Sequence, residues 1–385
     1  MSAEPTFGTR VGARRRDTVV IAFFLLLLFV PLAAYAFGVR PSNEENRPLA
    51  MMPPLDLVAA GEPAYFAAID RHLADNFPIK NQLVWANAAL RYTLLRTSPS
   101  PDVIVGAGDW LFSRESLEPT CTHGATDVLE QFDRINAALA DVGVDFQAVI
   151  VPDKQAIYPD RLPGGHTPCT DHERPLMMAG MRARGGFATE LWSGIEAARA
   201  LDSEALLYWP RDTHWSPSGA GIGFREVVNS ASPTAWSDDV LGLAGEMERV
   251  GDLSRLMGLP TVERLPKVVL DPPRTVKWRL LPTTVATTPS RELKNVIITG
   301  TPGTIDGRTL IIHDSAFGIY ADLLAAWFAD STWLHVNELA DHPEIVEGLP
   351  RFDRVILERV ERFAYRHDYA QMLAPVITLA EATAP

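Results

Sequence analysis

Short apolar stretches that alternate with helical patterns constrain the fold of the C-terminal half of this chain more than any other feature. Four of them, at 295–299, 309–312, 332–336 and 354–357, are rich in β-branched and apolar residues and are typical of buried strands. Such alternation predicts an α/β domain, a mostly parallel sheet with helices on both faces. Because ligands of such sheets bind beyond the carboxyl ends of the strands, we expect the functional site at that edge.

The motif that starts at Asp212 suggests what the site does. It follows a strand-like run at 205–210 and precedes a helical one at 220–228, with Ser216 as the expected N-cap and Pro217 at the first helical position. In an extended segment, side chains at i and i+2 project to the same side. Asp212 can therefore orient Nδ1 of His214 and leave Nε2 free, as the acid and base of a catalytic triad do.

Ser315 is a candidate nucleophile for that pair. It follows the strand-like run 309–312 and precedes a helical pattern at 319–328. A strand-to-helix turn favours developing negative charge, so the backbone N–H groups of Ser315 and Ala316 could help to form an oxyanion hole. Since both halves of the candidate triad follow predicted strands, they can meet, and the arrangement suits acyl transfer. The plainer alternatives are an Asp–His pair that caps a helix and a serine that serves as an N-cap.

The N-terminus predicts export of the remainder of the chain. Arg14, Arg15 and Arg16 precede an uncharged stretch, 18–39, that is long enough to cross a bilayer. The arginines indicate a cytoplasmic tail at 1–17 and an extracytoplasmic body. A signal-peptidase site at 34–36 is the alternative, and it also exports the body.

Composition excludes one function class and suggests a crosslink. The chain of 385 residues has a net charge of −13, and the four arginines and two acids of residues 1–17 leave −15 for the remainder. So acidic a body is a poor nucleic-acid binder. Cys121 and Cys169 are the two cysteines of the chain, and in an exported protein we expect a disulfide between them rather than two buried thiols. No cofactor is expected, and without ligand spacing among the histidines no metal is expected either.

The rest of the chain divides by pattern. Residues 40–100 are predicted to form a spacer and two juxtamembrane helices, which lie between about 62 and 96. Residues 101–385 form the main domain. Within it, 229–290 gives weak signals and is interpreted as an insertion that could supply a wall of the binding cleft.

With Asp212-Thr213-His214-Trp215, a following Ser-Pro-x-Gly-Ala, and His313-Asp314-Ser315 downstream, the chain resembles the AlgX/AlgJ-type polysaccharide O-acetyltransferases. Further support comes from the motifs at 108–112, 152–154 and 158–159, and the likeness covers roughly residues 60–365. The resemblance implies an SGNH-hydrolase-like (flavodoxin-like) fold, circularly permuted because the Asp and His precede the Ser.

By this resemblance, Ser315 is the nucleophile, His214 the general base and Asp212 its orienter. The implied reaction transfers acetyl groups to hydroxyls of an exported polysaccharide, with a membrane-bound O-acyltransferase as the partner that supplies them. The resemblance assigns no sugar contacts, but from their positions the candidate substrate contacts are Trp215, Lys154, Tyr158 and Arg359. The alternatives are core packing for Trp215, which is favoured, a solvated loop side chain for Lys154 and a solvated charge cluster for Arg359. The competing functions are an acetyl esterase with the same triad and a non-catalytic scaffold for the polysaccharide or the acyltransferase complex.

Overall fold

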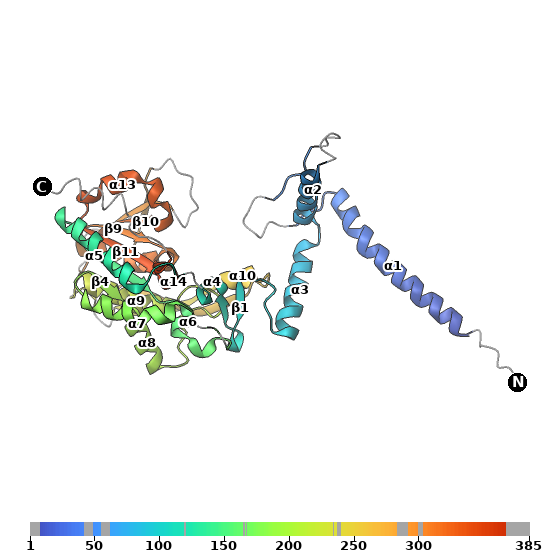
Figure 1. Cartoon of the computed structure of the whole chain (residues 1–385), viewed down its shortest axis with the longest axis horizontal. Coiled ribbons are helices and arrows are strands. Elements are labelled where there is room, and N and C mark those ends of the chain that lie inside the picture. The colour runs from blue at the N-terminus through green and yellow to red at the C-terminus, as the bar shows by residue number, and fades with distance from the viewer. Residues whose placement is uncertain are drawn as a thin grey trace. The chain divides into compact units, whose positions relative to one another are not determined.

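The chain forms two compact units, Met1–Pro99 and Ser100–Pro385. The structure, a computed structural model, describes residues 8–41, 49–54, 62–118, 121–164, 166, 168–233, 235–236, 240–282, 292–298 and 303–366. Each unit is described by itself (Figure 1).

The first unit is helical. It contains α1 (Gly8–Ala36), α2 (Pro63–Asn76) and α3 (Lys80–Leu95), and the last two are the helices predicted between 62 and 96. Within α1, Asp17–Ala36 has a mean hydropathy of 2.7 and is long and apolar enough to cross a membrane. The C-terminal end of α1 contacts α2, where the Tyr35 hydroxyl lies 2.6 Å from Nε2 of His72.

A seven-stranded sheet is the centre of the second unit. Its order is β4-β3-β11-β9-β10-β8-β7, and every neighbouring pair is parallel except β10–β8 and β8–β7. The mostly parallel sheet is therefore confirmed, with β8 as the exception. The strands are β3 (Asp145–Val151), β4 (Ala188–Glu190), β7 (Trp278–Leu280), β8 (Lys294–Ile297), β9 (Ile305–His313), β10 (Phe328–His335) and β11 (Arg354–Val360).

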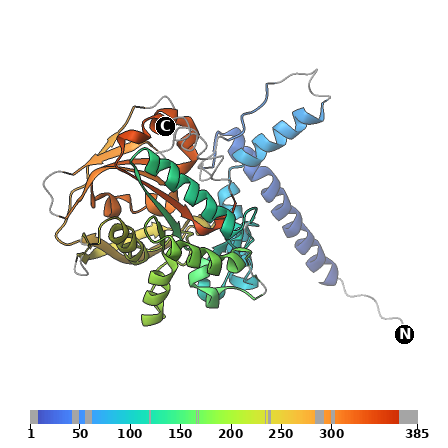
Figure 2. The same ribbon diagram turned by 60° about the vertical axis from the view of Figure 1, so that its left-hand side comes forward.

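Alternating residues of the central strands bury apolar side chains on both faces of the sheet, as expected for strands covered on both sides. One face packs on α5 (Ala125–Asp141), α7 (Thr170–Ala183) and α13 (Pro343–Glu347), and Figure 2 shows α5 lying across it. The other face packs on α9 (Pro217–Ala231) and α12 (Ala321–Ala325). Each large side chain fully buried in this way contributes roughly 1.5–3 kcal/mol to folding. The predicted helices on both faces are confirmed.

Smaller elements surround this core. The segment predicted to be an insertion forms an antiparallel hairpin, β5 (Leu241–Val250) and β6 (Val262–Leu270), with α10 (Asp252–Leu256) in its connection. It also supplies β7, so part of it joins the main sheet. The remaining strands and α-helices are β1 (Val103–Val105), β2 (Leu111–Ser113), α4 (Arg114–Leu117), α6 (Lys154–Ile157), α8 (Trp192–Leu201), α11 (Ser315–Gly318) and α14 (Glu361–Ala364).

Two local predictions were wrong. No strand forms at 205–210, where the structure has a single antiparallel bridge between Tyr208 and Trp215. The helix predicted at 319–328 is short, because α12 ends at Ala325 and Phe328 already begins β10. The predicted helix was too long because the apolar residues that follow it, Trp327 and Phe328, are also buried, although they lie outside α12.

The predicted disulfide is confirmed. Cys121 is bonded to Cys169 at the N-terminus of α7. The bridge closes a loop that contains α5 and β3, which constrains the unfolded chain and favours the folded state.

Candidate active site

The candidate base lies in a tight turn, residues 209–215, which we call the histidine turn. Trp209 N–H donates to the His214 carbonyl (3.1 Å) and Ser216 N–H to the Leu207 carbonyl (2.9 Å). The pair was expected in an extended segment, but the chain reverses here. The turn closes because the Asp212 carboxylate accepts the His214 N–H at 3.0 Å, a local bond that short acidic side chains favour.

The helix after the turn begins as predicted. Ser216 is the N-cap of α9, its hydroxyl accepts the Gly219 N–H at 3.1 Å, and Pro217 is the first helical residue. Gly219 is required by packing, since an added Cβ would collide with the Leu207 carbonyl. The Ser-Pro-x-Gly sequence thus fixes where the histidine turn ends and how closely α9 approaches it.

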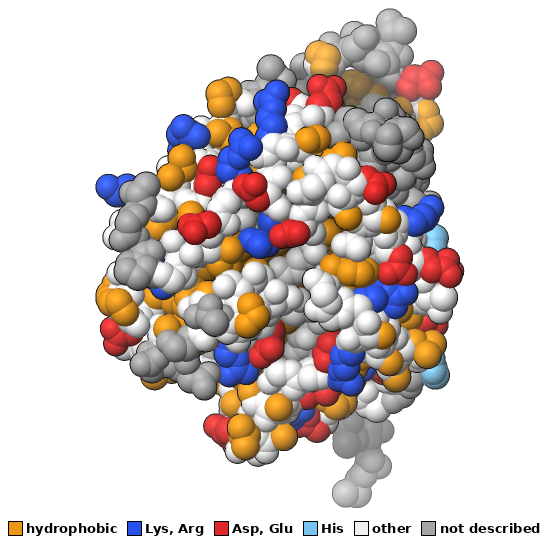
Figure 3. Space-filling view, turned by 90° about the vertical axis from the view of Figure 1, so that its left-hand side faces the viewer, with side chains coloured by type: hydrophobic (Ala, Val, Ile, Leu, Met, Phe, Trp, Pro, Cys, Tyr) orange, Lys and Arg blue, Asp and Glu red, His pale blue; other side chains and the backbone are white. Residues whose placement is uncertain are grey.

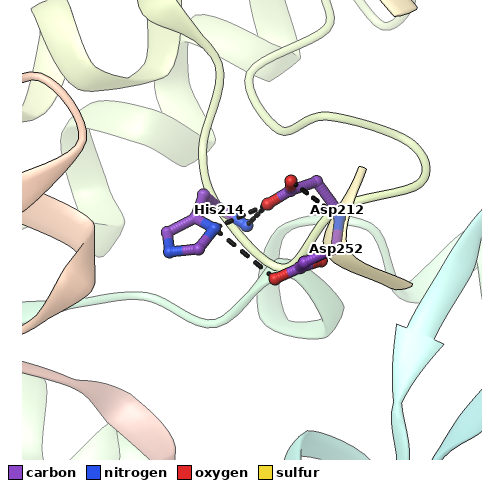
Figure 4. A group of neighbouring side chains, drawn as sticks. All are labelled: Asp212, His214 and Asp252. Carbon is purple, nitrogen blue, oxygen red and sulfur yellow. Dashed lines mark hydrogen bonds and ion pairs between the residues drawn. The ribbon is translucent and has the colours of Figure 1, made fainter. Parts of the chain in front are cut away.

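Asp212 and His214 form the predicted pair. Asp212 Oδ1 lies 2.6 Å from His214 Nδ1, and the Asp212 side chain is fully buried. Figure 4 shows the imidazole with Nδ1 toward the carboxylates and its other nitrogen pointing away from them. Nε2 is buried and has no hydrogen-bond partner among the described residues. This is the orientation that a general base needs.

Two side chains that the sequence analysis missed hold this pair. Arg249, on β5, donates from Nε to Asp212 Oδ2 at 2.6 Å, and one of its other nitrogens lies 3.3 Å from His214 Nδ1. Asp252 donates its backbone N–H to Asp212 Oδ2 (3.0 Å), and its carboxylate lies 3.6 Å from His214 Nδ1. It also accepts the Thr213 N–H and hydroxyl.

These contacts keep Asp212 ionised. Burial alone would raise the pKa of Asp212, but the hydrogen bond and charge of His214, together with Arg249, hold that pKa well below its usual range. The carboxylate is therefore a permanent negative partner for the imidazole, which stabilises an imidazolium during proton transfer.

Lys154 has a different role from the predicted substrate contact. Its side chain is buried, and Nζ donates to the backbone carbonyls of Trp209 (3.3 Å), Pro210 (3.1 Å) and Asp212 (2.7 Å). Burial lowers the pKa of Lys154 to about 8, against the nearby charges of Asp252 and Asp212. Because all three N–H donors of the ammonium are directed at the histidine turn, Lys154 positions that turn.

The candidate nucleophile lies in a second turn, residues 313–316, which we call the serine turn. Ser315 is half-buried and begins α11 directly after β9. Asp314 is the N-cap, and its carboxylate accepts the backbone N–H groups of Ala316 (3.0 Å) and Val360 (2.9 Å). The Ala316 N–H is thus already bonded, which contradicts its predicted place in an oxyanion hole. In the part of the chain that the structure describes, the Ser315 N–H has no such partner.

A buried carboxyl group on the neighbouring strand supports the serine turn. Glu358, on β11, accepts the Asp314 N–H at 2.8 Å. Burial and the negative charge of Asp314 raise the pKa of Glu358 well above its usual value, which favours the protonated form of this acid. Burial also acts to raise the pKa of Asp314, but Arg359 and the two N–H donors outweigh it and lower that pKa. The two acids at the serine turn are therefore shifted in opposite directions, with the pKa of Asp314 lowered and the pKa of Glu358 raised.

Trp215 connects the two turns. Its indole N–H donates to the Ala316 carbonyl at 2.9 Å, and its ring stacks on Phe317. Tyr320 adds a second link, since its hydroxyl accepts from Trp209 Nε1 (2.9 Å) and donates to the Trp215 carbonyl (3.3 Å). Trp215 is 1% exposed, which agrees with the core packing favoured for it and not with the alternative of a sugar contact.

Tyr158 and Arg359 are also structural. The buried Tyr158 hydroxyl donates to the Ala205 carbonyl (2.6 Å) and accepts the Leu207 N–H (2.8 Å), which ties α6 to the segment before the histidine turn. Arg359 is 2% exposed, and its guanidinium lies over the Phe363 ring. Neither side chain is accessible to a substrate, in contrast to the prediction.

Charged residues at the end of β11 form a buried network. Arg362 pairs with Asp153, and the Glu361 carboxylate accepts from Arg174 Nε (2.7 Å) and from the Asp153 N–H (3.0 Å). Asp153, Glu361 and Arg362 are all buried. The network joins the ends of β3 and β11, and β11 is the strand beside β9, which carries the serine turn.

The two carboxylates beside His214 could be considered as metal ligands. Among the described residues, Asp212, His214 and Asp252 bring ligand atoms within 4.8 Å of one another. However, the guanidinium of Arg249 lies against both Asp212 oxygens, at 2.6 and 3.5 Å. A fixed cation thus already occupies the position where a metal would bind, and the arrangement is that of a supported Asp–His pair.

Arg249 and Asp252 are functional candidates that the sequence analysis missed, and Glu358 supports the serine turn where its position after a strand had suggested a substrate contact. Arg249 is 37 residues from Asp212 and lies in a segment with weak secondary-structure signals. Glu358 follows three apolar residues, and this pattern predicted the strand but not the role of the Glu358 side chain. For Glu358, its position at the carboxyl end of a predicted strand was the available signal.

A mostly parallel sheet with helices on both faces, a serine turn at the end of its central strand and an Asp–His pair tied to that turn define an SGNH hydrolase-like α/β domain. Residues 103–278 match the family described as the SGNH hydrolase-like domain of acetyltransferase AlgX. The likeness to the AlgX/AlgJ-type family thus lies in residues 103–278, a little under half of the chain.

Individual relatives agree with this. A probable alginate O-acetylase AlgJ of Azotobacter vinelandii is 30% identical over 175 residues, which are 43% of this chain and 42% of that protein. The AlgJ of Pseudomonas aeruginosa is 29% identical over 156 residues, 40% of this chain and 39% of the relative. The matched part of the chain thus spans about two fifths of the length of these curated relatives.

Among solved structures, the O-acetyltransferase domain of Pseudomonas putida AlgJ is 17% identical, with 72% of this chain and 99% of that chain covered and a TM-score of 0.47. Bacillus cereus PatB1 is 12% identical, with 69% and 98% covered and a TM-score of 0.48.

Proposed function

We propose that the protein is an O-acetyltransferase that transfers acetyl groups to hydroxyls of an exported polysaccharide through Ser315, His214 and Asp212. The observation that carries the proposal is the state of His214, whose Nδ1 is held by Asp212 while Nε2 is free of partners among the described residues. The histidine turn is also bonded to the residue after Ser315, through Trp215. Its curated relatives are named probable alginate O-acetylases.

The chemistry has two half-reactions. His214 Nε2 removes the Ser315 hydroxyl proton while Oγ attacks the acetyl carbonyl of the donor, and the donor's leaving group takes that proton as its bond to the acetyl carbon breaks. Then His214 removes a proton from a sugar hydroxyl, which attacks the acetyl-serine ester. Serine is released with its proton restored, and the acetyl group is now an ester of the sugar. Throughout, Asp212 stabilises the imidazolium.

The setting we propose is the extracytoplasmic face of a membrane. The apolar helix α1 is its anchor, the acidic body is outside, and a membrane-bound O-acyltransferase supplies the acetyl groups. The disulfide is in keeping with an oxidising compartment.

The test uses the full chain in detergent with a chromogenic acetyl ester. Wild type is compared with Ser315→Ala and His214→Ala, and intact mass is read for an acetyl adduct. We expect each variant to lose at least about 10³-fold in acetyl release, with the adduct seen when Ser315 is present. Folded variants that keep the wild-type rate would exclude the triad. Addition of a polysaccharide acceptor then distinguishes the transferase, whose product is the acetylated sugar, from an esterase that releases acetate.

A further inference from the structure

The helix α3 has an apolar surface that is not covered within the first unit. One of its residues, Ala88, is buried. Scattered apolar side chains are normal on a soluble protein, and on the face shown in Figure 3 they are intermingled with charged ones. On α3, by contrast, they are crowded on one short helix, which marks an interaction surface. Its large apolar side chains that are between 45% and 71% exposed are Leu83, Val84, Trp85, Leu90, Leu94 and Leu95.

Three of these side chains form a stripe along α3. Leu83, Leu90 and Leu94 are seven and four residues apart, so they lie on one face of the helix, which we call the leucine stripe. Ala88 lies toward the opposite side, because it follows Leu83 by five residues and five residues rotate a helix by about 140°. The leucine stripe therefore points away from the side of α3 that is packed.

The charge of α3 also differs from that of the chain. Residues 80–96 contain three basic side chains, Lys80, Arg91 and Arg96, and no acid, whereas the whole chain has a net charge of −13. Lys80 pairs with Asp75 at 3.7 Å. Arg91 is exposed and comes directly after Leu90, at the flank of the leucine stripe. A basic side chain beside an apolar stripe is typical of a helix that lies on a membrane surface.

Contacts at the end of α1 place α3 near the membrane that α1 is proposed to span. The Tyr35 hydroxyl lies 2.6 Å from His72 Nε2, and His72 Nδ1 lies 2.7 Å from the Ala50 carbonyl, so the last turn of α1 is joined to α2 (Figure 1). The Arg40 guanidinium lies 3.8 Å over the Tyr35 ring, and tyrosines are enriched where a membrane meets water. Lys80 begins α3 and follows His72 by eight residues, which span about 30 Å at most. The helix α3 therefore begins close to the interface at which α1 ends.

We propose that α3 lies on the outer surface of an anionic membrane, the one that α1 spans. The leucine stripe lies among the acyl chains, and Arg91 binds the phosphates of the headgroups. This surface is a second attachment to the membrane, distinct from α1, and it needs neither Ser315 nor His214. The inference goes beyond the proposed function and shares with it the anchor α1. Since the second unit begins at Ser100, shortly after α3 ends, the attachment keeps its first residues near the membrane.

The test locates α3 in the full chain after reconstitution into vesicles of phosphatidylcholine with phosphatidylglycerol. An environment-sensitive fluorophore is attached to Leu90→Cys, and the lipids carry a nitroxide quencher on their acyl chains. Both native cysteines are bonded to each other, so the introduced thiol is the one that reacts. The matched control is Leu95→Cys, a leucine of similar exposure (62% against 54%) that lies about 140° around the helix from Leu90.

We expect the acyl-chain nitroxide to quench the label at position 90 at least about two-fold more strongly than the label at position 95. Equal quenching at the two positions would overturn the proposal. A label at position 90 with blue-shifted emission but no quenching by lipid would also overturn it, because a protein surface, either the second unit or another copy of the chain, would then cover the leucine stripe.

A charge variant tests the headgroup contact. In the Leu90→Cys background, Arg91→Gln should lower the inserted fraction of the label by up to about five-fold in anionic vesicles and leave it unchanged in phosphatidylcholine alone. Arg134→Gln, at an exposed arginine of the second unit, is the control and should behave like the parent in both lipids. If Arg91→Gln also behaved like the parent in both, the proposed contact with anionic headgroups would be wrong.

A label on α1 separates the failure of this inference from the failure of the anchor. Leu26→Cys lies within the apolar stretch Asp17–Ala36, and its label should be quenched strongly in both kinds of vesicle. Strong quenching at position 26 without quenching at position 90 would keep the anchor and overturn the attachment by α3. Absence of quenching at both positions would overturn both. Neither result depends on acetyl-ester release, which tests the triad alone.

Discussion

The histidine turn and the serine turn are held in different ways. The serine turn continues β9 and is supported by two acids that accept backbone N–H groups, Asp314 within the turn and Glu358 on the neighbouring strand β11. The histidine turn has one isolated bridge to hold its backbone, so distant side chains hold it: Lys154 from one side and Arg249 from the other. The backbone of a sheet can position a nucleophile, whereas a loop that carries a base needs charged side chains.

The largest effect should come from the acid of the histidine turn. Asp212→Asn keeps the shape but removes the negative charge that faces the imidazole, and we expect ester turnover to fall by about 10³- to 10⁴-fold. Asp252→Asn is the comparison, since its carboxylate is 3.6 Å from Nδ1 where that of Asp212 is 2.6 Å. Ester turnover of Asp252→Asn should fall by about ten-fold at most. Similar losses in kcat for the two variants would make Asp252 the principal partner.

An intermediate effect is expected from Arg249. Arg249→Met removes the cation against Asp212, but the backbone N–H of Asp252 still bonds that carboxylate, so kcat should fall by about 10- to 100-fold. Arg264→Gln serves as the control, because Arg264 is an exposed residue of the same hairpin that pairs with Glu248. Arg249→Lys should recover part of the rate. If Arg249→Met were as active as Arg264→Gln, the histidine turn would not depend on the hairpin.

Replacement of Glu358, beside the serine turn, should have the smallest effect on rate and a clear effect on stability. Glu358→Gln copies the protonated acid, so activity should stay within about three-fold of wild type. In wild type, the raised pKa favours the protonated form of Glu358 in the folded state, while the unfolded chain ionises it above its ordinary pKa of 4.5. The free energy of unfolding of wild type should therefore fall relative to the variant as pH rises from about 4.5 toward neutrality.

Denaturant unfolding of both proteins at several pH values measures this. The two should be equally stable near pH 4.5 and diverge above it, with the variant more stable. The opposite trend, a wild type that gains stability over the variant as pH rises, would show that Glu358 is ionised in the folded state.

Much of this architecture could be predicted from the sequence. Residues 309–312 and 354–357 were identified as strands because β-branched runs are uncommon outside buried strands. The start of α9 was predicted because Ser, Pro and Gly each have a local reason to be there. The direction of β8 could not be predicted, since side-chain alternation is the same in parallel and antiparallel strands.

The site residues whose roles could not be predicted are those that depend on long-range contacts. Lys154 was expected in a solvated loop because a lysine is rarely buried, and its burial follows from three carbonyls that converge when the histidine turn forms. Arg249 lies on a strand whose neighbours are mostly charged or half-exposed, so nothing local distinguishes it from a surface arginine. Its partner is set by how the hairpin packs, which Gly251 permits by its close approach to the Arg211 carbonyl.

The buried charges at the end of β11 also limit how this chain can change during evolution. Replacing only Arg362 would leave the buried Asp153 with an uncompensated charge, at a cost of about 3–5 kcal/mol, whereas Arg174 would keep Asp171 as a partner if Glu361 were replaced. Exchange of a whole pair for apolar residues is far better tolerated. Positions 153 and 362 should therefore be inherited as a linked pair, so that divergence at these two positions proceeds by double substitution while the exposed surface changes one residue at a time.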